Sequence, residues 1–200
     1  MKKFLHVGCG QKRKDQTTQG FNSPEWEELR FDIDEEVDPD LTGTILDMNN
    51  VSTGSVDAVY SSHNIEHVYP HEVSIALKEF FRVLTPKGFV VITCPDLQSV
   101  CELIAKDKLL EPAYTSPAGP ITPLDILYGH RPSLQRGNLY MAHKCGFTLN
   151  VLISVLRSHG FNSVAGKRRD TPFFDLFVIG FKGKVSEVEL RTAASSHFPN

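Results

Sequence analysis

The chain has no long hydrophobic run, no paired cysteines and no marked excess of either charge. Its apolar stretches, such as 89–93, are far shorter than the roughly 20 residues that a membrane-spanning helix needs, and no cleavage-site pattern follows the two N-terminal lysines. The net charge of −3 does not favour broad electrostatic binding to nucleic acid. We therefore expect no membrane partner and no nucleic-acid partner.

Cysteine is also scarce, with four residues and no Cys-x-x-Cys pair: Cys9, Cys94, Cys101 and Cys145. This usage is typical of reduced thiols in a cytoplasmic protein rather than of a disulfide framework. Histidines and cysteines do not follow one another at metal-ligand spacing either. The sequence therefore predicts no metal site.

What the sequence does contain begins with a short apolar strand, 4–7, that runs into Gly8-Cys9-Gly10. Glycine has no Cβ, so the backbone can turn sharply there and approach a ligand closely. A full dinucleotide fingerprint would place a third glycine where this chain has Arg13. The turn predicts a nucleotide-type pocket, although a plain strand-to-turn junction fits the same residues.

Acidic and polar residues follow the next three predicted strands. The second strand, 29–33, leads into Asp34, which lies 24 residues after Gly10. An acidic residue about 20 residues beyond the glycines can accept hydrogen bonds from ribose hydroxyls. A third strand, 43–46, ends at Asp47 and Met48, and a fourth, 55–60, ends at Ser61 and Ser62. The carboxyl edge of an open α/β sheet, where these residues should meet, is where ligands bind.

The rest of the pattern predicts an α/β fold: a Rossmann-like, mostly parallel sheet with helices on both faces and a C-terminal antiparallel hairpin. A helix from Pro70 carries apolar residues at helical spacing, and 89–93 reads as a buried strand. Segments 162–169 and 173–181 form the expected hairpin, joined by 170–172. We expect one domain over 1–182, followed by a polar, loosely packed tail over 183–200.

Residues 108–146 interrupt this pattern with prolines, aromatics and no clear periodicity, which favours an inserted lid or substrate segment. His130 and His143 in it can accept a proton near neutral pH, and Arg131 can grip an anionic group. His67, after the fourth strand, either orients its loop or acts as a base. The candidate catalytic residues are His143, His130 and His67, against the alternative that the polar residues of the insertion are simply solvated.

Taken together, these motifs resemble the class I S-adenosylmethionine-dependent methyltransferases, especially the large bacterial type 11 group. The most specific are the Glu66-His67 pair and the Arg-Val-Leu-x-Pro-x-Gly turn at 82–88. The resemblance rests on five segments: 5–10, 32–34, 47–48, 55–68 and 81–89.

The resemblance implies S-adenosylmethionine as the cofactor. It implies that Gly8 and Gly10 border the methionine moiety and that Asp34 binds the ribose diol. It further implies contacts from Asp47 to the adenine amino group, from the Met48 backbone to the adenine ring, and from Ser61 or Ser62 to the sulfonium side. The implied activity is methyl transfer to an unidentified small molecule.

Two alternatives stay open at this point: an NAD(P)-dependent oxidoreductase on a similar sheet, and a non-catalytic cofactor-binding module. The second is motivated by segment 11–23, which lacks the apolar stripe of the helix that normally follows the glycines. Cover for the cofactor would then come from the insertion or from a partner chain, so homo-oligomerisation is left open.

Overall fold

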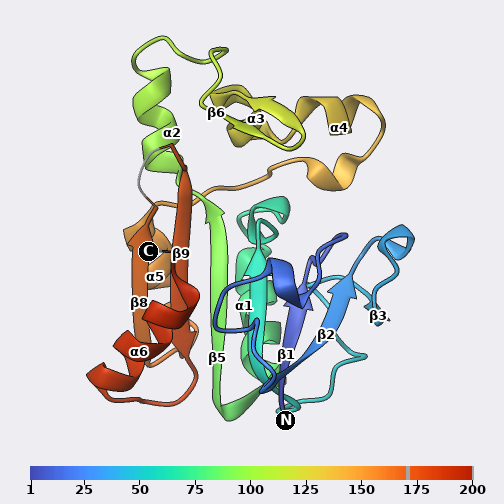
Figure 1. Cartoon of the computed structure of the whole chain (residues 1–200), viewed down its shortest axis with the longest axis vertical. Helices are drawn as coiled ribbons and strands as arrows, with labels where there is room; N and C mark the ends of the chain where they lie inside the picture. The colour runs from blue at the N-terminus through green and yellow to red at the C-terminus, as the bar shows by residue number, and fades with distance from the viewer. Residues whose placement is uncertain (170–171, 200) are drawn as a thin grey trace.

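A computed structural model describes residues 1–169 and 172–199. One seven-stranded sheet in the order β3-β2-β1-β4-β5-β9-β8 forms its centre (Figure 1). The first five strands are parallel, and β9 runs antiparallel to both β5 and β8. The strands are β1 Lys2–Val7, β2 Trp26–Asp32, β3 Leu41–Thr42, β4 Val56–Ser62, β5 Leu84–Pro95, β8 Ser163–Arg168 and β9 Asp175–Phe181.

Helices and short 3-10 turns connect and cover this sheet. The helices are α1 Val73–Val83, α2 Leu97–Ile104, α3 Pro123–Tyr128, α4 Arg131–Gln135, α5 Leu149–Ser158 and α6 Glu187–His197. The 3-10 turns are η1 Lys14–Gln16, η2 Glu35–Val37, η3 Ile65–His67 and η4 Leu139–Met141. None of the helices in the described ranges is long and apolar enough to cross a membrane.

Alternation along the strands builds a core on each face of the sheet. Leu5 and Val7 of β1 face one apolar cluster, which also holds the buried residues of α1 and α5. Phe4 faces the opposite cluster, where residues of α6 and Phe21 pack. Successive side chains of a strand point to opposite faces, so central strands buried on both sides read as continuous apolar runs. The predicted Rossmann-like fold, with helices on both faces and a closing hairpin, is confirmed.

The C-terminal segment differs from the prediction of a loose tail. Ser186 and Glu189 form a reciprocal capping box at the start of α6, and Leu190 packs on the sheet. His197 at its end is only 5% exposed. The prediction of a loosely packed 183–200 is therefore wrong for the described residues, because a mostly polar helix buries a narrow stripe that composition does not reveal.

The third strand is also shifted from its predicted place. It covers only Leu41–Thr42, and the predicted segment 43–46 is a turn closed by a bridge between Thr44 and Asp47. A Cβ on Gly43 would lie 2.7 Å from the Phe31 ring, so this turn passes directly over β2. Of the predicted hairpin connection at 170–172, residues 170 and 171 lie outside the described ranges.

Segment 11–23 contains no α-helix, as its sequence predicts, and only the short η1. In place of such a helix, a side chain of β2 helps to hold the glycine loop. Arg30, only 2% exposed, donates from its guanidinium to the backbone oxygens of Gly10, Lys12 and Val37. The glycine loop is thus tied to the β2–η2 connection by one buried cation.

The insertion lies over the carboxyl ends of the strands (Figure 1). It contains a small hairpin of β6 Tyr114–Ser116 and β7 Gly119–Ile121, followed by α3, α4 and η4. Asp125 stabilises it by completing the capping box with Thr122 and by accepting a 2.7 Å hydrogen bond from Arg131 Nε. The predicted lid segment is therefore an ordered layer rather than a solvated loop.

Candidate active site

The glycine loop takes the conformation that its composition predicts. Gly8 and Gly10 both have positive φ, at +62° and +51°. A Cβ on Gly8 would lie 2.5 Å from the Asn64 side chain, whereas one on Gly10 would meet nothing among the described atoms within 4 Å. Gly8 thus permits close packing against the end of β4, and Gly10 faces open space.

Asp32 holds the glycine loop and the end of β2 together. Its carboxylate accepts hydrogen bonds from the backbone nitrogens of Gly10, at 2.8 Å, and Asp34, at 3.0 Å. The Gly8 nitrogen donates to the Phe31 oxygen. Both glycine N–H groups are therefore engaged within the chain, so these two donors are not free for a ligand carboxylate.

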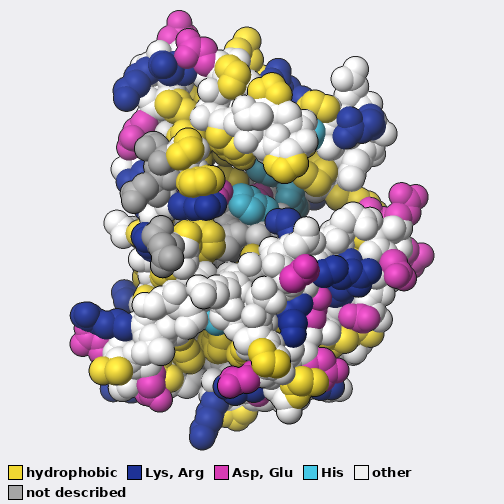
Figure 2. All heavy atoms as spheres, in the orientation of Figure 1, with side chains coloured by type: hydrophobic (Ala, Val, Ile, Leu, Met, Phe, Trp, Pro, Cys, Tyr) yellow, Lys and Arg dark blue, Asp and Glu magenta, His cyan; other side chains and the backbone are white. Residues whose placement is uncertain are grey.

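A cavity of about 370 Å³ opens beside this loop, and we call it the glycine-loop cavity. Its walls come from the glycine loop, the tip of β2, the 43–46 turn, the η3 region and η4 of the insertion. Figure 2 shows a hollow between the insertion and the sheet in which histidine side chains gather. The insertion, through Asn138, Tyr140 and Met141, supplies the cover that the missing helix does not.

Three of the predicted cofactor residues line this cavity: Gly8, Gly10 and Asp34. One oxygen of the half-buried Asp34 carboxylate accepts from the Glu36 nitrogen at 3.0 Å, and no hydrogen bond within the described chain engages the other. Asn64 also lines the cavity, and its buried Nδ2 has no hydrogen-bond partner among the described residues. Two residues that border this cavity, Asp34 and Asn64, thus each keep a side-chain polar atom without a hydrogen-bond partner in the described chain.

The other four predicted cofactor residues, Asp47, Met48, Ser61 and Ser62, are not brought to the lining described for this cavity. Asp47 is exposed, and Met48 is buried with its nitrogen donating to Glu79 and its oxygen accepting from Arg82. Ser62 Oγ accepts from Thr93. The wall expected from Asp47 and Met48 comes instead from Thr44, Ile45 and Leu46, because the strand ends earlier than its sequence suggests.

Two of the candidate catalytic histidines, His67 and His143, lie together beside Glu66. Their ring centroids are 4.9 Å apart. His67 Nδ1 is 3.0 Å from the Ala142 oxygen, and His143 Nδ1 is 2.7 Å from the Ile126 oxygen. A carbonyl oxygen only accepts, so in each neutral ring Nδ1 carries the proton and Nε2 keeps its lone pair.

The third candidate, His130, is placed elsewhere. Its Nδ1 is 2.8 Å from Ser133 Oγ at the start of α4, and it is not part of the lining described for either cavity. Arg131, expected to grip a substrate, instead pairs with Asp125 inside the insertion. The structure therefore does not bring these two predicted contacts to the candidate site.

The central group of the cluster is Glu66, which the sequence marks only as the first residue of the Glu66-His67 motif. Its side chain is 1% exposed, and neither carboxylate oxygen has a hydrogen-bond partner among the described residues. Its backbone oxygen accepts from Lys144 and Cys145, which joins η3 to the end of the insertion. Sequence distance hid this arrangement, because η3 and the insertion meet only in the folded chain.

Charges around Glu66 favour its ionised form. Burial alone would raise its pKa, but the neighbouring His63, with His67 and His143 nearby, lowers it. His63 lies between two carboxylates, 3.4 Å from Glu66 Oε1 and 3.3 Å from Asp175 Oδ1. Burial lowers the pKa of His143, which keeps its ring neutral near pH 7.

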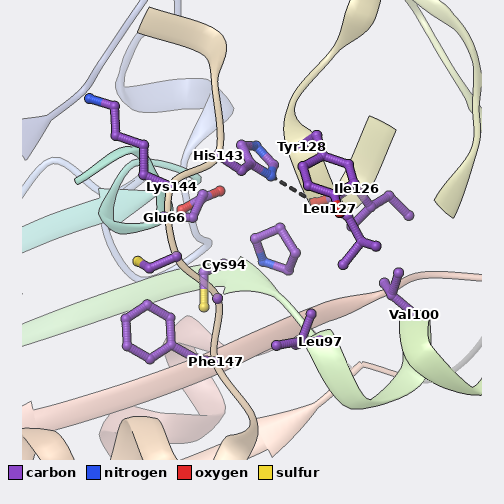
Figure 3. Close-up of a pocket in the computed structure, with 13 residues that line it drawn as sticks. Glu66, Cys94, Leu97, Val100, Ile126, Leu127, Tyr128, His143, Lys144 and Phe147 are labelled. Carbon is purple, nitrogen blue, oxygen red and sulfur yellow. Dashed lines mark hydrogen bonds between the residues drawn. The ribbon is translucent and has the colours of Figure 1, made fainter. Parts of the chain in front are cut away.

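A second cavity, of about 220 Å³, borders Glu66 and His143, and we call it the insertion cavity (Figure 3). Its walls are largely apolar, with Leu97, Val100, Ile126 and Phe147 among them, and Glu66 and His143 lie at one end. Lys144 lines both cavities, while His67 lines the glycine-loop cavity. The cluster of Glu66, His67 and His143 therefore stands at the junction of the two spaces.

Residues 5–92, which contain the glycine loop and η3, match the family described as a methyltransferase domain. This match covers less than half of the chain, and it agrees with the resemblance of the motifs to the class I S-adenosylmethionine-dependent methyltransferases, whose cofactor is S-adenosylmethionine. A separate comparison with curated proteins gave no match.

Solved structures support the fold. A SAM-dependent methyltransferase from Methanosarcina mazei aligns with a TM-score of 0.60 at 17% identity, covering 92% of this chain and 93% of its own. One from Archaeoglobus fulgidus aligns with a TM-score of 0.55 at 15% identity, covering 90% and 86%. The 1,6-didemethyltoxoflavin-N1-methyltransferase of Burkholderia thailandensis, solved with 1,6-didemethyltoxoflavin and S-adenosylhomocysteine, aligns with a TM-score of 0.58 at 13% identity, covering 91% and 71%.

Proposed function

We propose that this methyltransferase moves a methyl group from S-adenosylmethionine in the glycine-loop cavity to a small molecule in the insertion cavity. The observation that carries the proposal is the junction itself. Glu66 and His143 line the insertion cavity, His67 lines the glycine-loop cavity, and Lys144 lines both. Two adjoining spaces of this kind allow a donor and an acceptor to meet without exchange through water.

The residues of the glycine-loop cavity fit an adenosyl amino acid. The free oxygen of Asp34 suits a ribose hydroxyl, and the unpaired Nδ2 of Asn64 suits a carboxylate or carbonyl oxygen. Ile45 and Leu46 offer apolar surface for a purine. The cavity's size of about 370 Å³ lies within the ordinary range of small-molecule sites.

The insertion cavity has a different chemistry. Its apolar walls suit an acceptor with an apolar body, and Glu66 and His143 at one end suit a polar substituent. S-adenosylmethionine supplies a methyl group that is already activated, so the protein's task is to align the acceptor and exclude water. If the acceptor atom carries a proton, the free Nε2 of His143 can receive it, with His67 packed against the His143 ring.

The proposal places the protein in a reducing compartment such as the cytoplasm. All four cysteines are free thiols, and Cys9 and Cys94 are buried. Burial raises the pKa of Cys9 to about 11, so its thiol stays protonated and unreactive.

The test has a binding stage and a turnover stage. We expect isothermal titration to show one equivalent of S-adenosylhomocysteine bound, and S-adenosylmethionine with a radioactive methyl group to label at least one member of a small-molecule panel. Binding without any labelled product across the panel would support the non-catalytic module instead. Binding of NADH, with no heat from S-adenosylhomocysteine, would overturn the proposal in favour of an oxidoreductase.

A further inference from the structure

Three metal-ligand side chains converge at the junction of the two cavities. One donor atom each from Glu66, His67 and His143 lies within 4.8 Å of the other two. Two of these residues belong to η3 and the third closes the insertion, so the fold brings together what the sequence separates. The expectation of no metal site rested on spacing along the chain alone, which does not register this convergence.

Both histidines are held as metal-binding histidines are held. In protein metal sites, the ring nitrogen that does not bind the ion donates its proton to a backbone carbonyl or a carboxylate, which fixes the tautomer. Here Nδ1 of His67 donates to Ala142 and Nδ1 of His143 donates to Ile126. Nε2 of each ring is left as the binding atom.

Glu66 supplies the second, independent observation. A buried carboxylate without a partner is costly, because burial removes its hydration. Both of its oxygens lack a hydrogen-bond partner among the described residues, and His63 approaches to 3.4 Å without hydrogen-bond geometry. A cation placed between Glu66 and the two imidazoles would satisfy the carboxylate and both lone pairs at once.

The donor set indicates which cation. Two imidazole nitrogens and one carboxylate oxygen form the ligand set of open zinc sites, which keep a further position for water or substrate. Bond lengths of about 2.0–2.1 Å place tetrahedral ligands roughly 3.4 Å apart, so the donor atoms would draw together on binding. Mg²⁺ is disfavoured here because it prefers oxygen ligands.

We propose that Glu66, His67 and His143 bind one divalent transition-metal ion of the Zn²⁺ class, with an open position between the glycine-loop cavity and the insertion cavity. With the ion bound, the two histidines serve as ligands, and an acceptor oxygen or water takes the open position. The site shares residues with the proposed function, but metal binding is measurable without cofactor or acceptor. The two proposals can therefore fail separately.

The test uses the full chain after treatment with a chelator. Co²⁺ is added as a spectroscopic probe for visible absorption bands, and Zn²⁺ affinity is measured against a coloured competing chelator. We expect one equivalent of each metal to bind and Zn²⁺ to raise the melting temperature. We expect Glu66→Gln and His143→Gln to bind Zn²⁺ about tenfold more weakly or worse.

His130→Gln is the matched control, because His130 lies in the same insertion and its side chain contacts Ser133 instead of the cluster. It should bind Co²⁺ and Zn²⁺ as the unchanged chain does. Circular dichroism without metal checks that each variant folds, and His143→Gln decides the question if Glu66→Gln does not. The proposal is overturned if less than one equivalent binds, or if both ligand variants keep full affinity. Methyl transfer by a chain that binds no metal would leave His143 as the base and only this inference rejected.

Discussion

At the scale of single residues, Asp32 and Arg30 explain how the glycine loop keeps its shape without the helix that would normally follow it. The Asp32 carboxylate fixes the nitrogens of Gly10 and Asp34, and Arg30 fixes the oxygen of Gly10. A carboxylate and a guanidinium thus hold the loop from opposite sides. The loop is built by side chains of β2, so its geometry depends on that strand.

The two acidic residues that the sequence singled out, Asp34 and Asp47, make a matched pair for testing the cofactor site. Asp34 lines the glycine-loop cavity, whereas Asp47 is exposed and lies outside its described lining. Asp34→Asn should weaken S-adenosylhomocysteine binding about tenfold or more, because a hydrogen bond to a charged group is worth about 1.5–3 kcal/mol. Asp47→Asn should leave the dissociation constant unchanged in isothermal titration.

Equal losses in both variants would contradict the placement of Asp47 and restore the adenine contact that the family resemblance implies. A loss in Asp47→Asn alone would also remove Asp34 from the site. Both substitutions keep the size of the side chain, so thermal unfolding should be nearly unchanged in each.

Gly10 and Gly54 provide a second pair. Both have positive φ, and a Cβ at either meets no described atom within 4 Å, but only Gly10 lines the glycine-loop cavity. Valine at either position should cost about 1–2 kcal/mol of folding free energy through left-handed strain. Gly10→Val should in addition abolish detectable S-adenosylhomocysteine binding, while Gly54→Val should retain it. Similar affinities in the two folded variants would show that Gly10 does not face the bound cofactor.

Whether a site residue can be located from the sequence depends on whether it belongs to a recognisable sequence pattern. Gly8, Gly10 and Asp34 stand at strand ends with a characteristic offset, so their positions are readable from the chain. Met48 was expected to act through its backbone, and backbone groups leave no trace in residue identity. The neighbourhood of His67 and His143 depends on how the insertion folds back, which periodicity does not encode.

At the scale of elements, the insertion is held by an internal network centred on Asp125. This carboxylate is buried and accepts from Thr122 at the start of α3 and from Arg131 in α4. Hydrogen bonding from Arg131 and Thr122 outweighs burial and holds its pKa well below the usual range. The network fixes α3 against α4, and α3 carries Ile126, whose oxygen orients His143.

Asp125→Ala should therefore loosen the insertion while leaving the sheet intact. We expect hydrogen–deuterium exchange to quicken about tenfold or more over 122–135 and to stay unchanged in β4 and β5, since local openings report local stability. Glu111→Ala is the control, because the ion pair of Glu111 with Lys108 in the same segment is exposed. Faster exchange throughout the sheet would show that the insertion and the sheet unfold as one unit.

Elements differed in how well the sequence predicted them for physical reasons. α1 buries Val73, Ala76, Leu77, Phe80 and Val83 at helical spacing, so its pattern is unambiguous. β3 is two residues long, too short for alternation to mark it. α6 packs on the sheet through a narrow apolar stripe, and most of its other residues are polar. Its sequence therefore resembles that of a loose tail, and the capping box that starts the helix is evident only in the structure.

At the scale of the whole molecule, the loop between β1 and β2 meets the end of α6 on one face of the sheet. His197 of α6 approaches Thr18 at 2.6 Å and packs against Phe21, with ring centroids 4.3 Å apart. A Cβ on Gly20 would lie 2.6 Å from the His197 ring, so the loop between β1 and β2 presses directly on the end of α6. This contact closes the face that a crossover helix would otherwise cover.

The same contact makes stability sensitive to acid. Burial lowers the pKa of His197 to about 4, against about 6.5 in the unfolded chain. Between these values the unfolded chain binds more protons than the folded one, so folding stability falls as pH drops from about 6.5 to about 4. The full effect is about 3 kcal/mol, since each pKa unit corresponds to about 1.4 kcal/mol. Above pH 7 the contribution is constant.

His197→Phe keeps an aromatic ring in the cluster but removes the titrating group. Its free energy of unfolding, measured in urea at pH 7 and pH 5, should fall less between the two values than that of the unchanged chain. It should also be lower at pH 7, because Thr18 loses its partner. His71→Phe, at an exposed position, should retain the original difference. An unchanged acid response in His197→Phe would mean that other groups set it, and that the contact between the β1–β2 loop and α6 has no part in the pH dependence.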